Sequence, residues 1–232
     1  MSKKETEQKE EVIIDVAASL TKAEAFVENN KKIITYVVAG VLVLVAGYFG
    51  FTKLYLEPLE REAQLELFKA QENLDRDSLR LALNGDGVSM GFLEIAEEYS
   101  WTKAGNLSRY YAGVCYLQLG EYEDAIRQMD KFSTSDPVFK VLTNGVIADA
   151  FLELNQPKEA LEYYNKAVNA SDNEFVVPFY LKKAGMLAEE QGKLKEARRY
   201  FERLKNEFPK SQHALDAEKF LARIDAKEMN SK

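Results

Sequence analysis

The sequence predicts an all-α protein, in which an N-terminal transmembrane helix precedes an α-solenoid that ends in a capping helix. Three observations lead to this prediction. The 232 residues include only 12 Gly and 5 Pro, a composition that favours helices over a β-sandwich or barrel. A long apolar run without charged residues lies near the N-terminus. Beyond it, a helical pattern recurs at spacings of 35 and 37 residues.

The apolar run spans residues 33–51, which are 19 residues without a charge (IITYVVAGVLVLVAGYFGF). At about 1.5 Å per residue, a helix of this length covers roughly 28 Å, close to the ~30 Å hydrocarbon core of a bilayer. Tyr36 and Tyr55 lie near its ends, where aromatic side chains favour the membrane interface. We therefore expect residues 33–55 to cross a membrane. The alternative of a buried core helix fits the length of the run poorly.

A cleaved signal peptide is a second alternative for this run. The 32 preceding residues are too many for a signal peptide, and no A-x-A cleavage site follows, so we expect an uncleaved anchor. Basic residues on the two sides of the run nearly balance, but a long C-terminal domain is translocated largely regardless of charge. We therefore expect the N-terminus in the cytoplasm and the larger domain across the membrane.

The segment before the span, residues 1–32, divides into two parts. Residues 1–10 are polar and charged, and we expect them to lack regular structure. Residues 11–30 place apolar side chains at helical spacing and predict an amphipathic helix. These side chains are Ile13, Val16, Leu20, Ala23 and Val27. This helix either docks on a membrane surface or partner or stays solvated, and the pattern leaves both readings open.

Residues 56–232 form the predicted solenoid domain, and three segments within it align with one another: 106–137, 141–172 and 178–209. Each begins with a helix of periodic apolar residues, passes through a turn and continues into a second helix. The turns lie at Gly120, at 155–157 and at Gly192.

The three segments share small and aromatic residues at fixed positions. Positions are counted from the first residue of each segment. Position 8 holds Gly113, Ala148 and Gly185, and position 20 holds Ala125, Ala160 and Ala197. Tyr116 and Phe151 occupy position 11, and Tyr164 and Phe201 occupy position 24. Small residues let two helices cross closely, and aromatic rings fill the space beside the crossing. The pattern resembles the tetratricopeptide repeat, a helix-turn-helix unit of about 34 residues.

The flanking segments complete the predicted solenoid. Residues 59–83 and 88–99 are expected to form a preceding helix pair, broken at the turn 84–87. Residues 211–227 predict the capping helix that shields the end of a repeat array. Pro58 is expected to end or kink the helix that leaves the membrane.

The composition argues against catalysis and against several classes of ligand. One Cys and one His leave no disulfide framework, zinc site or catalytic His grouping, so we expect no enzyme, metal or cofactor. Cys115 is interpreted as a packing residue and His213 as a surface residue. Residues 1–53 carry seven basic and seven acidic residues, so the net charge of −7 belongs to the rest of the chain. An acidic domain without a basic stripe argues against nucleic acid, and no motif for a small-molecule substrate is present.

Repeat arrays bind partners through the surface lined by the first helix of each repeat. The predicted partner groove consists of Leu107, Tyr110, Val114, Leu117, Asp149, Leu152, Phe179, Lys182 and Met186, with Glu189 at its end. The groove is mainly apolar and suits an apolar or amphipathic segment, with Tyr110 as the strongest anchor. The alternative is that neighbouring helices cover several of these residues.

Some tetratricopeptide proteins hold a C-terminal carboxylate with basic groove residues. The corresponding positions here are Tyr110, Val114, Val146, Phe179 and Lys183. Only Lys183 is basic, so this carboxylate-binding function is not transferred to the present chain.

The stretch GFLEIAEEYSWTKAGNLSRYYAGVCYLQLGEYEDAI, residues 91–126, together with the N-terminal anchor, resembles a bacterial family of inner-membrane proteins. These have one N-terminal span and a periplasmic tetratricopeptide domain, a layout shared with the ancillary periplasmic subunit of the Sec translocon. The resemblance implies a periplasmic repeat domain in the inner membrane. It also implies an accessory role in envelope protein biogenesis, with translocon subunits, periplasmic chaperones or secreted polypeptides as partners. A scaffold or assembly factor of an outer-membrane or secretion complex is the alternative.

Overall fold

The computed structural model describes the backbone of residues 3–230 and the side chains of residues 26–230. The chain divides into two compact units, Met1–Pro58 and Leu59–Lys232. Over the described residues, all regular elements are helices, and the β-structure is one isolated bridge between Gly85 and Met90. The predicted all-α fold is confirmed.

The first unit consists mainly of one long helix, α1 (Lys3–Phe51). Residues 3–10 belong to it, so the expectation that residues 1–10 lack regular structure is wrong for the part described. The reason is local, since Lys, Glu and Gln have high helix propensity. Within the helical stretch Phe26–Asp75, the most apolar window has a mean hydropathy of 2.2, and none of it is buried by protein. By length and composition, this helix can cross a membrane.

A π-helical turn, η1 (Thr52–Leu56), lies between α1 and α2 (Glu57–Asp75). The N–H of Glu57 donates to the carbonyl of Thr52, five residues earlier. Pro58 follows in the first turn of α2 and has no N–H to donate to the carbonyl of Leu54. The wider turn accommodates this missing hydrogen bond. The helix therefore does not end at Pro58.

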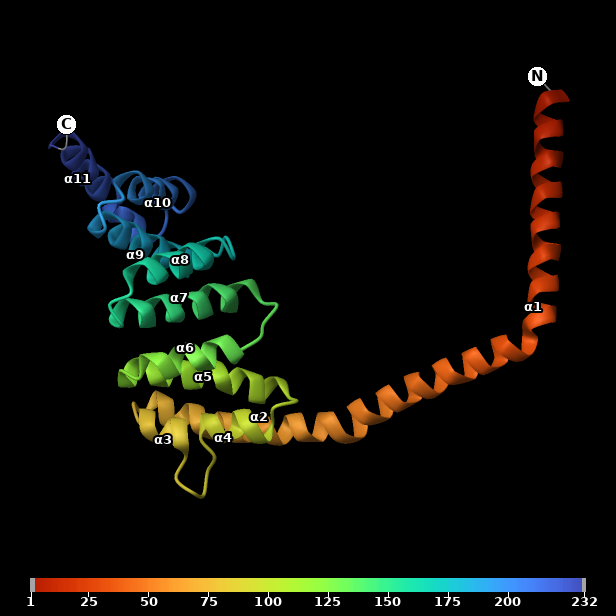
Figure 1. Cartoon of the computed structure of the whole chain (residues 1–232), viewed down its shortest axis with the longest axis horizontal. Helices are drawn as coiled ribbons and strands as arrows, with labels where there is room; N and C mark the ends of the chain where they lie inside the picture. The colour runs from red at the N-terminus through yellow and green to blue at the C-terminus, as the bar shows by residue number, and fades with distance from the viewer. Residues whose placement is uncertain (1–2, 231–232) are drawn as a thin grey trace. The chain divides into compact units, whose positions relative to one another are not determined.

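The second unit continues from α2 with nine further α-helices among its described residues. They are α3 (Leu79–Asn84), α4 (Phe92–Glu98), α5 (Lys103–Leu119), α6 (Tyr122–Lys131), α7 (Pro137–Glu153), α8 (Pro157–Val168), α9 (Val177–Glu190), α10 (Leu194–Glu207) and α11 (Ala217–Asn230). From α4 onward, each helix packs against the next one along the chain, in the stacked order that Figure 1 shows from yellow-green to blue.

The turn inside each repeat has the same backbone geometry. Gly120 joins α5 to α6, Asn155 joins α7 to α8, and Gly192 joins α9 to α10, with φ of 79°, 57° and 72°. These residues occupy the same repeat position, number 15. The left-handed conformation favours Gly and is tolerated by Asn, which explains why the turns could be recognised in the sequence.

The small residues at positions 8 and 20 lie where the two helices of a repeat cross. Ala125, Ala148, Ala160 and Ala197 are all fully buried. A Cβ added to Gly185 would come within 2.6 Å of the Phe201 ring, the aromatic residue at position 24 of the same repeat. The predicted packing role of these positions is confirmed.

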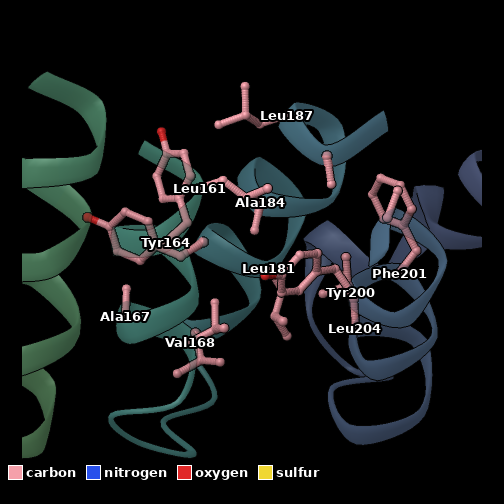
Figure 2. Packing of buried hydrophobic residues seen from close by; sticks show 14 of the residues in the cluster. Leu161, Tyr164, Ala167, Val168, Leu181, Ala184, Leu187, Tyr200, Phe201 and Leu204 are labelled. Carbon is pink, nitrogen blue, oxygen red and sulfur yellow. The ribbon is translucent and has the colours of Figure 1, made fainter. Parts of the chain in front are cut away.

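The largest part of the core lies between α8, α9 and α10. Figure 2 shows Leu161 and Tyr164 from α8, Leu181 and Leu187 from α9 and Phe201 from α10 packed together between the helices. The cluster continues to Phe220 and Ile224 of α11. The last helix therefore covers the apolar end of the third repeat, as a capping helix does.

The flanking elements differ in detail from the predicted ones. The expected helix 59–83 is two helices, α2 and α3, separated by a turn in which Asp77 has a φ of 58°. The expected helix 88–99 begins only at Phe92, because the Gly85–Met90 bridge closes a hairpin loop before it. The predicted cap 211–227 begins as a 3₁₀ turn, η2 (Gln212–Asp216), and becomes α-helical at Ala217.

Enlarging a helix-crossing residue should destabilise the repeats. Ala160 is 0% exposed on α8, so Ala160→Leu should lower the free energy of unfolding of residues 58–232 by about 1–3 kcal/mol through overpacking. Urea denaturation followed by circular dichroism measures the effect. The control is Glu162→Leu, at an exposed position of the same helix, which should stay within about 0.5 kcal/mol of the parent. Equal effects of both changes would contradict the helix-crossing role of Ala160.

Candidate partner-binding cleft

A cleft of about 720 Å³ opens on the first helices of the three repeats and on α11. These helices supply most of its lining, because the first helices of successive repeats stack side by side. The lining residues are Leu117, Tyr122, Asp149, Leu152, Glu153, Tyr164, Lys183, Met186, Leu187, Glu189, Glu190, Arg223 and Lys227. They combine apolar side chains with two networks of ion pairs.

The first network is centred on Asp149 of α7. Lys183 of α9 donates to both carboxylate oxygens of Asp149, at 2.7 and 2.8 Å, and the hydroxyl of Tyr164 also donates to Oδ1. Burial, followed by the charge of Asp149, raises the pKa of Tyr164, so its hydroxyl stays protonated as a donor. The lysine is therefore engaged by Asp149 in the free protein.

The second network is centred on Glu189 of α9, which is only 5% exposed. Arg223 Nε donates to its Oε1 at 2.7 Å, and Lys227 Nζ donates to the same oxygen at 2.8 Å. Burial by itself raises the pKa of this carboxyl, but the hydrogen bonds and charges of Arg223 and Lys227 outweigh it and hold the pKa below its ordinary value. Glu189 is thus ionised at neutral pH and ties α11 to the third repeat.

The apolar part of the cleft is accessible to a ligand. Leu152 is 39% and Met186 is 47% exposed, and Leu117 is half-buried beside them in the lining. Exposed leucine and methionine side chains offer apolar contact area and need no hydrogen-bond partner on the ligand. The cleft can therefore accept a large apolar side chain next to charged groups.

The cleft brings together four of the predicted groove residues: Leu117, Asp149, Leu152 and Met186, with Glu189 beside them. Leu107, Tyr110, Val114, Phe179 and Lys182 lie outside its lining. Leu107 and Val114 are half-buried against core clusters. Lys182 forms an ion pair of 3.4 Å with Asp216, and the Phe179 ring lies 5.6 Å from that of His213.

Tyr110, the expected anchor, belongs to an aromatic cluster between α5 and α7. Its ring centroid lies 5.2 Å from that of Phe139 and 5.6 Å from that of Phe132. Burial raises the pKa of Tyr110 to about 12. Its ring contacts are made within the solenoid, which corresponds to the alternative that neighbouring helices cover some groove positions.

The sequence interpretation missed the cationic side of the cleft. It identified both Lys183 and Asp149 but not the ion pair between them, and it treated the last helix only as a cap, which left out Arg223 and Lys227. A signal was present, since Lys183 follows Asp149, and Arg223 follows Glu189, by 34 residues each. That spacing is close to one repeat length, which places the two side chains of each pair on neighbouring helices of the stack.

Neither a metal-binding cluster nor a reactive thiol is found among the described residues. No group of three or more His, Cys, Asp or Glu side chains among them could hold a metal ion. Cys115 is fully buried, and burial raises the pKa of its thiol to about 12. A thiol with that pKa stays protonated at neutral pH and is a poor nucleophile.

Comparisons with known proteins agree with the repeat architecture. Residues 107–137 and 181–211 match one family model described as tetratricopeptide repeat, and residues 143–174 match another with the same description. The chain is therefore an α-solenoid in which three segments match the tetratricopeptide repeat. Such repeats are protein–protein interaction modules.

The comparison with solved structures supports the fold at low sequence identity. A structure titled "Crystal structure of MamA protein" superposes with a TM-score of 0.53 at 13% identity, covering 71% of this chain and 86% of that one. A second MamA structure gives a TM-score of 0.49 at 13% identity, covering 70% and 95%. No curated protein sequence matches the chain.

Glu189→Gln tests the second network. The folded pKa of Glu189 lies below the ordinary value of 4.5, so its stabilisation is complete above about pH 4.5 and is lost as the pH falls through the folded value. The variant should lose about 1.5–3 kcal/mol at neutral pH, the usual range for hydrogen bonds to a charged group. Its stability should also fall less on acidification than that of the parent. Denaturation at neutral and acidic pH measures both effects, with the exposed neighbour Glu190→Gln as the control. An unchanged acid dependence would refute the assignment.

Proposed function

We propose that this protein is a membrane-anchored module that binds other proteins through the cleft on its repeats. In this proposal, residues 33–55 cross the bacterial inner membrane, residues 1–32 lie in the cytoplasm, and the domain formed by residues 56–232 lies in the periplasm. The protein acts there as an accessory factor of the Sec translocon or of the periplasmic chaperone network. Its partners are translocon subunits, chaperones or secreted polypeptides.

The single observation that carries the binding function is the cleft itself. It combines exposed Leu152 and Met186 with charged side chains on the first helices of stacked repeats. An accessible apolar surface beside charged groups suits a polypeptide segment, because such a segment carries both apolar and polar side chains.

The membrane anchor is supported by the exposed apolar surface of α1. Val43 and Leu44 are 71% and 74% exposed, and the most apolar window of the helix is not covered by protein. Such a surface is stable in a hydrocarbon environment and unfavourable in water. The Sec assignment is supported by the resemblance of residues 91–126 and of the one-span layout to the envelope proteins named above.

The topology predicts a specific proteolysis pattern. Protease added to intact spheroplasts should digest residues 56–232 and leave a membrane-bound N-terminal stub, because a single uncleaved span places the two ends on opposite sides. Immunoblotting with antibodies to each end, in intact and lysed spheroplasts, reads out the pattern. Full protection of the repeats in intact spheroplasts would reverse the orientation.

The binding site predicts a specific crosslinking pattern. A photocrosslinking residue at Leu152 or Met186 should capture partner proteins in living cells, because both side chains line the cleft and are exposed. The controls are Glu162 on α8 and Glu202 on α10, which are exposed outside the cleft. Mass spectrometry of the products identifies the partners. Capture only from the control positions would favour a scaffold that assembles through the second helices of the repeats.

A further inference from the structure

The second helices of the three repeats follow the usual charge preference of helix ends. Each has an acidic residue in its first turn: Glu123 in α6, Glu159 in α8 and Glu196 in α10. Each also has a basic residue in its last turn: Lys131, Lys166 and Lys205. These placements complement the helix dipole, whose C-terminal end is negative.

The first helices do not follow this preference. None of α5, α7 and α9 has a basic residue in its last turn. The last residue of α7 is Glu153 and the last residue of α9 is Glu190, so a carboxylate adds to the negative helix end. Both occupy the same position, number 13, of their repeats, and both line the cleft. The two helices that end in an acidic residue, against the usual charge preference, therefore end at the cleft.

The basic residues of the cleft do not neutralise these two carboxylates. Lys183 is paired with Asp149, and Arg223 and Lys227 are paired with Glu189. Among the described residues, no basic group lies within ion-pair distance of Glu153 or Glu190, and the Glu153 carboxylate accepts only a hydrogen bond of 3.3 Å from the Tyr122 hydroxyl. The lining of the cleft thus includes two carboxylates without a basic partner, together with Leu152 and Met186.

We propose that the cleft selects polypeptide segments in which Lys or Arg residues flank large apolar side chains. The apolar residues of the segment contact Leu152 and Met186, while its cations pair with Glu153, Glu190 and the negative ends of α7 and α9. An acidic segment would be repelled by the same two carboxylates. This inference rests on the proposed function, because it names the partner chemistry of that site.

Three matched amphipathic peptides test the inference. They share their apolar positions and carry Lys, Gln or Glu at the polar positions. Binding is measured by fluorescence anisotropy with the full chain in nanodiscs of zwitterionic lipid, and empty nanodiscs serve as the blank. The Lys peptide should bind most tightly and the Glu peptide least tightly. Added salt should reduce the differences in affinity between the peptides, because the paired charges are partly exposed.

Two double variants test whether the charge effect comes from Glu153 and Glu190. Glu153→Gln with Glu190→Gln should weaken binding of the Lys peptide by about 2- to 30-fold, the range expected for two partly exposed ion pairs. Glu162→Gln with Glu202→Gln makes the same change in net charge on α8 and α10, outside the cleft, and should leave binding unchanged. A third variant, Leu152→Ser with Met186→Ser, should weaken the binding of all three peptides, because it removes the apolar contact that they share.

The outcomes separate this inference from the proposed function. Equal binding of the three peptides, weakened by Leu152→Ser with Met186→Ser, would overturn the charge preference and leave the cleft as an apolar binding site. An equal loss in the control double variant would also overturn it, since the effect would then come from the overall negative charge. Binding of none of the peptides, together with no crosslinks from Leu152 or Met186, would overturn both proposals.

Discussion

The solenoid depends on the close crossing of two helices inside each repeat. The crossing requires a small side chain at position 8 of the first helix and at position 20 of the second. Gly113, Ala148 and Gly185 meet the first requirement, and fully buried Ala125, Ala160 and Ala197 meet the second. Because the helices approach so closely, one large residue at position 24 fills the remaining space, as Phe201 does beside Gly185. The angle of each pair, and with it the face presented to a ligand, follows from this contact.

Contacts between residues about one repeat length apart hold the stacked helix pairs together. Lys183 pairs with Asp149, Arg223 with Glu189, and the side chain of Gln191 donates to the Pro157 carbonyl, each across 34 residues. In a repeat array, residues about one repeat length apart lie on neighbouring units, so their side chains can form contacts between those units. Glu153 and Glu190 occupy the same position of successive repeats, and both line the cleft.

The repeats were predictable because their signals are local: small residues, aromatic residues and turn residues recur at fixed spacing. The flanks were less predictable, since the break at Asp77 and the 3₁₀ start of the last helix have no repeated pattern to compare with. Four of the nine groove residues reached the cleft, and the pairing of its charges was missed. Helical periodicity tells which face a residue occupies, but it does not tell whether a partner side chain covers it, as the rings around Tyr110 do.

The placement of Arg223 and Lys227 on the last helix links the charge of the cleft to the end of the fold. A stacked array opens most readily at its termini, where each unit has a neighbour on one side only. Opening of α11 alone would withdraw two of the three cations of the cleft and expose the Glu189 carboxylate. The lining would then hold four carboxylates and one lysine, so the cleft would become strongly acidic. Fraying at the C-terminus would thus change the electrostatic potential of the cleft.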